Sequence, residues 1–271
     1  MNKIYQLLPT LGFLIVLYFA STTKLLASND TSHTRDESNV DAEVVTTKPL
    51  SLIPYNASYE IIRDNKTLGH ATRKLSKLNE QWQLTFFTSM KKWFYKYQLT
   101  TQSTFIIDNN AVQPQSFYSK TKRSFKKDRL ISSDFNWQDK VETGRNKNNT
   151  WSLPLNNELY DNLSFQVALR LVDQSSKTQT FNVSYKGIRL PYLFINQGTA
   201  SIDTAMGKID TILWEQQTAS SESEFIKIWL APKYQYLPVQ IAQYDQGQLQ
   251  GTIRIESIIW DGNALAKLSH E

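Results

Sequence analysis

The chain has 271 residues, of which 40% are hydrophobic and 12% aromatic, a composition that suits one ordinary globular protein with a sizeable core. It contains no cysteine, which excludes disulfide partners, thiolate metal sites and a cysteine nucleophile. The formal net charge of +5 is too small to require a nucleic acid, and we expect no nucleic-acid partner.

The N-terminal 27 residues are typical of a secretory signal peptide. Lys3 gives a short basic start, an apolar run follows at 11–20, and Ala27 is a suitable last residue before cleavage. This order of basic, apolar and small residues predicts export. The alternative is an uncleaved N-terminal anchor, although the apolar segment 4–20 is short for a membrane-spanning helix of about 20 residues.

Residues 28–48 are rich in Ser, Thr, Asn and acidic side chains. Such a segment cannot bury enough apolar surface to offset the entropy of ordering it, so we predict a disordered spacer. Cleavage after residue 27 would remove two lysines and no acids, which leaves 28 bases against 25 acids and a net charge of +3. We expect one folded domain at 49–262 and a C-terminal tail at 263–271, because no repeat or second spacer divides the region between.

Apolar and polar residues alternate in short runs throughout the region after the spacer. Period-two alternation places one row of side chains of each strand in the core and the other row in solvent. Short polar turns separate the runs, which favours a mainly β fold: a single curved or barrel-like antiparallel sheet. The predicted inward rows are Tyr55, Ala57, Tyr59 and Ile61; Trp82, Leu84 and Phe86; Ile131, Ser133, Phe135 and Trp137; and Phe181, Val183 and Tyr185.

One segment, "LYDNLSFQVALRLVDQSS", has helical periodicity. Leu163, Val167 and Leu171 recur every four residues and would form one apolar stripe. Asp161 or Asn162 is a suitable N-cap, since a short side-chain oxygen accepts a free backbone N–H of the first turn. We therefore expect one short helix packed on the sheet.

The stretch "FIKIWLAPKYQYLPVQI" at 225–241 alternates at both ends and holds two prolines between them. Pro232 cannot donate a ladder hydrogen bond and would end the first strand, whereas Pro238 would enter at the start of the next. The turn "YDQGQ", where Gly247 can take a positive φ, would lead into the returning strand "GTIRIESI". These three runs predict an antiparallel meander.

Four segments resemble one family of exported bacterial envelope proteins. The stretch "IKIWLAPKYQYLPVQIAQYDQGQLQGTIRIESI" is similar to the C-terminal signature of the DUF3108 family, W-L-a-p-d-x-x-x-L-P-v-k followed by a strand pair. "YNASYEIIRDNKTLGHATRKL", "YDNLSFQVALRL" and "TAMGKIDTILWE" are similar to earlier parts in the same order, so the resemblance covers roughly 52–260. The chain departs from the pattern at Lys233, where an acid is usual, and in its long spacer. The resemblance implies an exported β-rich protein, periplasmic in Gram-negative bacteria, without an assigned function or catalytic residues to carry over.

Catalytic and metal-binding motifs are weak. His33 lies in the spacer and His270 beside the last residue, which leaves His70 as the one histidine in a predicted strand. A lone imidazole lacks partners, and no G-x-S-x-G elbow, His pair or phosphate-binding glycine loop is present. We predict no catalytic residue, metal or cofactor. A glycan-acting hydrolase stays open as an alternative, and its paired carboxylates would come from Asp161, Asp203, Asp210, Glu215, Glu222 and Glu224.

Two stretches that mix basic and aromatic residues are the candidate binding surface: "MKKWFYKYQL" and "SKTKRSFKKDRL". A run of charges is most often a solvated strand face, but cations interleaved with amphipathic rings also suit a membrane interface. The stretches could act together if they lie on adjacent antiparallel strands. The candidate binding residues are Lys91, Lys92, Trp93, Tyr95, Lys122, Arg123, Lys126 and Lys127.

The 7 Trp, 13 Tyr and 13 Phe would mostly fill the concave side of a curled sheet. An incompletely filled interior could instead hold an acyl chain or a glycan. Three functions stay open. The protein would bind a lipid, lipopolysaccharide, glycan or other apolar or anionic envelope component; it would act as the hydrolase above; or it would bind another envelope protein through an exposed sheet edge.

Overall fold

Strands form almost all of the described chain. The computed structural model describes residues 52–108, 111–155, 158–218 and 224–261, so the predicted signal peptide, spacer and C-terminal tail lie outside the described residues. Its fifteen strands belong to one sheet. The first eight, which run up and down in neighbouring hairpins, are β1 (Tyr55–Arg63), β2 (Lys66–Leu78), β3 (Gln81–Lys92), β4 (Tyr95–Asp108), β5 (Ala111–Arg123), β6 (Lys126–Asn136), β7 (Val141–Asn146) and β8 (Asn149–Pro154).

Within the described residues, the second half of the chain adds seven strands and two short helices. The α-helix α1 (Phe165–Leu171) connects the first two of these strands, and the 3₁₀ helix η2 (Pro232–Tyr234) connects the fifth and sixth. The strands are β9 (Leu159–Asp161), β10 (Thr178–Tyr185), β11 (Ile188–Thr204), β12 (Gly207–Gln217), β13 (Phe225–Ala231), β14 (Leu237–Asp245) and β15 (Gln248–Trp260).

The sheet has two free edges and is open, not a closed barrel. The strand order is β8-β7-β6-β5-β4-β3-β2-β1-β15-β14-β13-β12-β11-β10-β9. The first and last strands of the domain, β1 and β15, pair with each other at the centre of the sheet. All pairs are antiparallel except β9 with β10, which are joined through α1 and run parallel. The predicted single curved antiparallel sheet with one packed helix is confirmed in this form.

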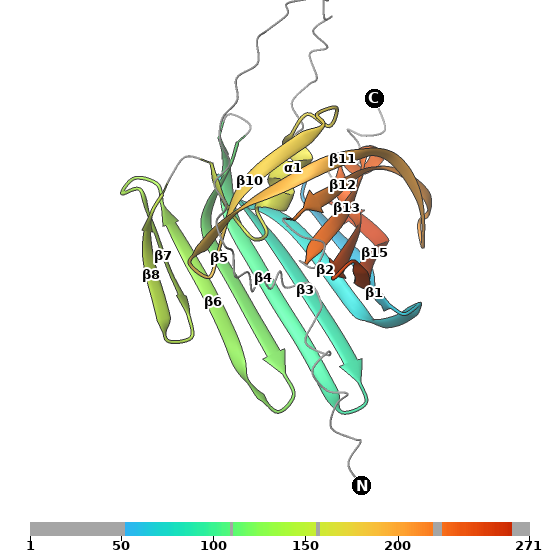
Figure 1. Ribbon diagram of the computed structural model, residues 1–271, viewed down its shortest axis with the longest axis horizontal. Coiled ribbons are helices and arrows are strands. Elements are labelled where there is room, and N and C mark those ends of the chain that lie inside the picture. The colour runs from blue at the N-terminus through green and yellow to red at the C-terminus, as the bar shows by residue number, and fades with distance from the viewer. Residues whose placement is uncertain (1–51, 109–110, 156–157, 219–223, 262–271) are drawn as a thin grey trace, which may run out of the picture.

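The sheet curls around its helix. Figure 1 shows α1 inside the curl, with β10 and β11 crossing over it and the long strands β2–β5 behind. The helix packs against β5 and β10. Because the curl brings both halves of the sheet toward α1, a single apolar core holds buried side chains from both halves.

The predicted inward rows are buried in almost every strand. In β1 the four residues of the row are at most 3% exposed, and the intervening positions are half-buried or exposed. The rows of β3, β6 and β10 are buried as predicted, with Ser133 a buried polar member, and Trp137 lies half-buried just beyond the end of β6. Alternation predicts burial well here because one face of an antiparallel sheet packs on the core.

The helix begins later than predicted. Its N-cap position is Ser164, not Asp161 or Asn162, and the side chain of Ser164 makes no cap hydrogen bond. Asp161 instead accepts hydrogen bonds at Oδ1 from the backbone N–H groups of Leu163 and Ser164, each 2.8 Å long. It therefore caps the tight turn that leads into α1. Within the described residues, no helix has the length and apolarity needed to cross a membrane.

The predicted meander is confirmed as β13, β14 and β15, which are antiparallel neighbours. Pro232 follows β13 directly and opens η2, and Pro238 is the second residue of β14. Gly247 has a φ of 72° in the turn between β14 and β15, a conformation that costs glycine little.

Candidate functional site

Two neighbouring hairpins bring the two basic, aromatic-rich stretches together. The β3–β4 hairpin turns at Trp93 and Phe94, and the β5–β6 hairpin turns at Ser124 and Phe125. Since β4 pairs with β5, the two turns lie side by side at one end of the sheet, the lower end in Figure 1. We call residues 90–97 and 122–127 the basic-aromatic tip.

Hydrogen bonds between the two hairpins fix the geometry of the basic-aromatic tip. The backbone N–H of Ser124 donates to the carbonyl oxygen of Lys96 over 2.9 Å, and the backbone N–H of Lys96 donates back to Ser124 Oγ, also over 2.9 Å. Ser124 Oγ in turn donates to the carbonyl oxygen of Phe94 over 3.3 Å. The two turns are thus held as one surface.

Three large apolar side chains project into solvent from this surface. Trp93 is 82% exposed, Phe94 76% and Phe125 84%. The rings of Phe94 and Phe125 meet edge to face, with centroids 6.1 Å apart and planes at 65°. Single exposed apolar residues are common, but a contiguous exposed cluster marks an interaction site.

The backbone at the two turns is also unusual for aromatic residues. Trp93 has a φ of 53° and Phe125 a φ of 61°, in the left-handed region where glycine, asparagine and aspartate are the favoured residues. A bulky side chain there costs of order 1 kcal/mol or more. Because both rings are exposed, packing in the core does not compensate for this cost.

The basic-aromatic tip carries charge of one sign. It contains seven basic residues and no acidic ones. Lys91 and Lys96 are directly opposite each other on β3 and β4, and like charges in opposed positions destabilise a sheet. Asp128, the first acidic residue after the tip, forms an ion pair with Lys120, with 3.4 Å between Oδ2 and Nζ. An anionic partner would relieve this repulsion.

All eight predicted binding residues lie in the basic-aromatic tip. Trp93 is exposed in the turn, and Lys91, Lys122, Lys126 and Lys127 are exposed around it. Tyr95 and Arg123 are half-buried, and Lys92 is the last residue of β3. The two basic, aromatic-rich stretches could act together only if they lie on adjacent strands, and the pairing of β4 with β5 places them there. Their role in binding stays a prediction.

Sequence reasoning did not select the exposed rings Phe94 and Phe125. Their signal was present in the sequence: each hairpin has a two-residue turn that contains an aromatic residue and no Gly, Asn or Asp. Turn residues are normally polar or glycine, so an aromatic pair at a tip needs a separate explanation.

The histidine and carboxylate candidates form no reactive cluster among the described residues. His70 is an exposed residue of β2, and its Nδ1 lies 3.4 Å from Oε2 of Glu256. Glu215 is ion-paired with Lys227 at 2.8 Å, and Asp210 accepts a hydrogen bond from Ser201. Glu222 lies outside the described residues. No group of three or more possible metal ligands occurs within the described ranges.

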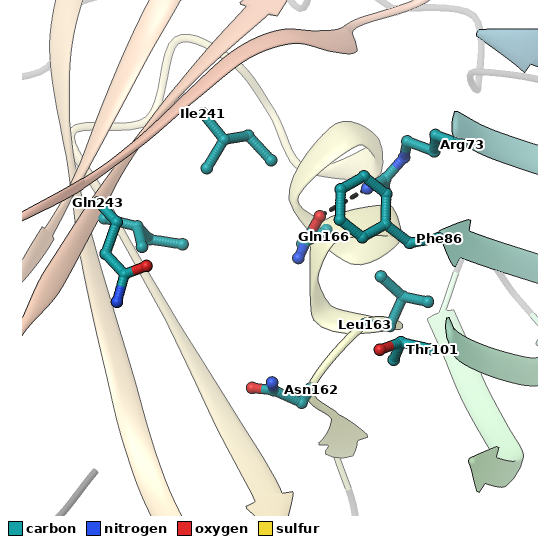
Figure 2. A pocket seen from close by; sticks show the side chains of 9 residues that line it. Arg73, Phe86, Thr101, Asn162, Leu163, Gln166, Ile241 and Gln243 are labelled. Atoms are coloured by element: carbon teal, nitrogen blue, oxygen red, sulfur yellow. Dashed lines mark hydrogen bonds between the residues drawn. The ribbon is translucent and has the colours of Figure 1, made fainter. Parts of the chain in front are cut away.

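The interior of the curl is largely filled by side chains. Phe165 of α1 contacts Phe181, Tyr192 and Phe194 with ring centroids 5.5–6.2 Å apart. Among the described residues, a cavity of about 40 Å³ lies between α1, the strands β2–β4 and the strands β13–β14 (Figure 2). A cavity of this size holds a few water molecules or one small group, not an acyl chain.

Residues 54–254 match the family described as a protein of unknown function, DUF3108. The chain belongs to the DUF3108 family. The suspected resemblance is therefore confirmed, and the family description assigns no activity. Among curated proteins, none is significantly similar to this DUF3108 chain.

Two solved structures are similar to this DUF3108 chain. A β-barrel-like protein of the DUF1849 domain family from Brucella abortus is similar to it with a TM-score of 0.53 and 11% identity, covering 78% of this chain and 99% of that one. A provisionally named lipoprotein from Parabacteroides distasonis covers 78% of this chain and 97% of its own, with 10% identity and a TM-score of 0.29. At such identity, the Brucella protein supports the β-barrel-like architecture alone.

Proposed function

We propose that this protein is exported to the periplasm and docks onto an anionic lipid surface of the cell envelope through its basic-aromatic tip. The observation that carries the proposal is the combination, on two clamped hairpins, of three exposed rings with seven cations and no acid. At a membrane interface, exposed aromatic rings insert at the boundary between headgroups and acyl chains, and nearby cations contact the anionic headgroups.

The charges supply attraction at long range. Each Lys or Arg near an anionic membrane contributes about 1 kcal/mol, and the attraction decays within a Debye length of about 10 Å in 0.1 M salt. Lys91, Lys96, Lys122, Lys126 and Lys127 are all exposed. Binding driven by these charges should therefore weaken as salt is added.

The rings supply attraction at contact. Moving a fully exposed Trp or Phe side chain out of water contributes up to about 1.5–3 kcal/mol. Trp93, Phe94 and Phe125 are turn residues of the β3–β4 and β5–β6 hairpins, and the two hairpins end side by side at the lower end of the sheet in Figure 1. The backbone strain at Trp93 and Phe125 is consistent with residues retained for contact and not for stability.

Neither alternative function has a comparable feature in its favour. The hydrolase requires two carboxylates that face each other across a cleft, but none of the five candidate acids within the described residues lines the cavity. The edge-binding function requires an accessible edge strand. One edge strand, β9, has three residues and the other, β8, ends in Pro154, and both features limit strand addition.

Vesicle co-sedimentation tests the proposal. The purified protein should sediment with vesicles that contain phosphatidylglycerol and remain in solution with pure phosphatidylcholine vesicles. Replacing the three rings by serine (Trp93→Ser, Phe94→Ser and Phe125→Ser together) should weaken binding by roughly 100-fold or more, the equivalent of about 3 kcal/mol. Replacing Lys91, Lys122, Lys126 and Lys127 by glutamine should remove the salt dependence.

The matched control replaces two exposed apolar residues that lie elsewhere, Leu249 and Ile259, by serine. This variant should sediment as the unaltered protein does. Equal sedimentation of the ring variant and the unaltered protein would contradict the proposal, and so would preference for neutral vesicles. Fractionation of cells that express the full chain tests the periplasmic location separately, and recovery with the cytoplasm would contradict it.

A further inference from the structure

Two arginines that have no acidic partner among the described residues are buried inside the curl. Arg73 of β2 and Arg170 of α1 are each 1% exposed. Within the described ranges, neither guanidinium forms an ion pair with a carboxylate. Buried arginines are almost always paired with an anion, because desolvating an isolated charge is costly. Two such charges in one core therefore need an explanation.

The groups that surround the two guanidiniums are neutral. Arg73 donates from Nε to Tyr55 Oη over 3.0 Å and from Nη1 to Gln166 Oε1 over 2.7 Å. Arg170 lies over the same tyrosine, with Cζ 5.6 Å from the ring centroid, and donates twice to the carbonyl oxygen of Gln235. Burial raises the pKa of the neighbouring Tyr59 well above its usual value, so this phenol supplies no countercharge.

Each guanidinium also has a nitrogen with no hydrogen-bond acceptor. Nη2 of Arg73 and Nη1 of Arg170 are buried and lack a partner within the described residues. Arginine is a donor at every nitrogen and has no other protonation state to adopt. Buried donors in native proteins are nearly always satisfied by protein, by water or by a bound group. The unsatisfied positions therefore indicate where an acceptor would bind.

The cavity of about 40 Å³ lies directly beside one of these arginines. Figure 2 shows Arg73 and Gln166, joined by their hydrogen bond, at one side of the space, with Thr101 and Asn162 below and Gln243 across it. These five polar residues are part of its lining, together with apolar side chains. The size and polarity suit a single charged group of a few heavy atoms.

We infer that the cavity binds an oxyanion, a carboxylate or a phosphate group, at the guanidinium of Arg73, with the charge of Arg170 strengthening the attraction. The planar fork of an arginine matches the oxygens of both groups. The hydroxyl of Thr101 and the amides of Gln166 and Asn162 also line the cavity and are groups that can donate hydrogen bonds. The site is separate from the basic-aromatic tip and does not depend on membrane docking.

Thermal unfolding of the purified protein tests the inference, with sodium acetate, sodium octanoate and inorganic phosphate as probes against sodium chloride at equal ionic strength. A bound oxyanion at about ten times its Kd should raise Tm by about 3–6 °C. A response to acetate or phosphate identifies a free anion, and a stronger response to octanoate identifies the head group of an amphiphile. No response to any probe beyond that to chloride would overturn the inference.

The Arg73→Met variant separates a binding role from a structural one. If an anion binds at Arg73, the variant should lose the anion-dependent rise in Tm and bind the probe at least about tenfold more weakly. Arg73→Lys, which keeps the charge but not the fork, should retain part of the response. An unchanged response in Arg73→Met would overturn the inference; if that variant does not fold, the lysine variant and the unaltered protein still decide it.

Two further measurements distinguish this site from the basic-aromatic tip. The ring variant that loses vesicle binding should keep its full response to the oxyanion probe. Arg73→Met should keep vesicle binding. Loss of the oxyanion response in the ring variant would contradict a separate interior site, whatever the outcome of the vesicle experiment.

Discussion

Glu142 of β7 and Arg189 of β11 form an ion pair, with 3.1 Å between Oε2 and Nη2, although 47 residues separate them in the chain. Glu142 is fully buried and also accepts hydrogen bonds from Ser184 Oγ (2.6 Å) and Trp151 Nε1 (3.1 Å). These strands lie near opposite ends of the sheet order. Side chains, not a strand ladder, therefore hold the two ends of the open sheet together.

The first prediction concerns this contact. Glu142→Ala should lower the free energy of unfolding by about 3–5 kcal/mol, because the buried carboxylate of Glu142 is the shared acceptor of Arg189, Ser184 and Trp151. Urea denaturation measures the change. The matched control is Glu215→Ala, which breaks the half-exposed pair with Lys227 and should cost about 1 kcal/mol or less. Equal losses in the two variants would mean that Glu142 does not hold the sheet ends together.

The second prediction concerns Asp161. Burial raises the pKa of this carboxyl to about 6, and its hydrogen bonds from Ser103 and from the backbone at Leu163 and Ser164 oppose the rise. Since the folded pKa lies above the unfolded value, the stabilisation is present below about pH 4 and is lost as the pH rises through 6. Asp161→Asn mimics the protonated form.

Relative to the Asn variant, the unaltered protein should lose up to about 3 kcal/mol of unfolding free energy between pH 4 and pH 7. Urea denaturation of both proteins across this range measures the difference. A difference that stays constant, or that shifts in favour of the unaltered protein as the pH rises, would contradict the raised pKa.

The third prediction separates stability from binding at the basic-aromatic tip. Asparagine adopts the left-handed conformation of residue 125 more readily than phenylalanine does, so Phe125→Asn should raise the unfolding free energy by roughly 0.5–1 kcal/mol. The same change should weaken sedimentation with anionic vesicles, because one of the three exposed rings is lost. Leu249→Asn, at an exposed position without a positive φ, should alter neither quantity. Lower stability of the Asn variant would argue that Phe125 serves the fold.

Local patterns predicted the parts of the structure that depend on local spacing. The row Tyr55, Ala57, Tyr59 and Ile61 is buried because alternation and the pleat have the same period, and the two prolines end and begin strands where their missing N–H groups predict. The prediction of Asp161 or Asn162 as the helix N-cap was wrong, because the N-cap position is Ser164 and Asp161 caps the turn that precedes the helix. Sequence spacing alone does not distinguish these two positions.

The sequence patterns could not predict contacts between side chains that lie far apart in the chain. Arg73 and Arg170 lie in two separate segments of the chain, and their common contact with Tyr55 arises only when α1 packs inside the curl. Likewise, the meeting of Phe94 and Phe125 depends on the pairing of β4 with β5. The number of strands and the open edges follow from the curvature of the whole sheet, which no single segment encodes.

The fluorescence of Trp93 tests the central claim most directly. All seven tryptophans lie in the described part of the chain, and Trp93 alone is exposed. Phosphatidylglycerol vesicles that carry bromine on the acyl chains near the headgroup should quench the unaltered protein more than its Trp93→Phe variant, although both bind. Equal quenching of the two proteins, or none in the unaltered protein under conditions of full binding, would show that the tip does not enter the membrane interface and would contradict the account.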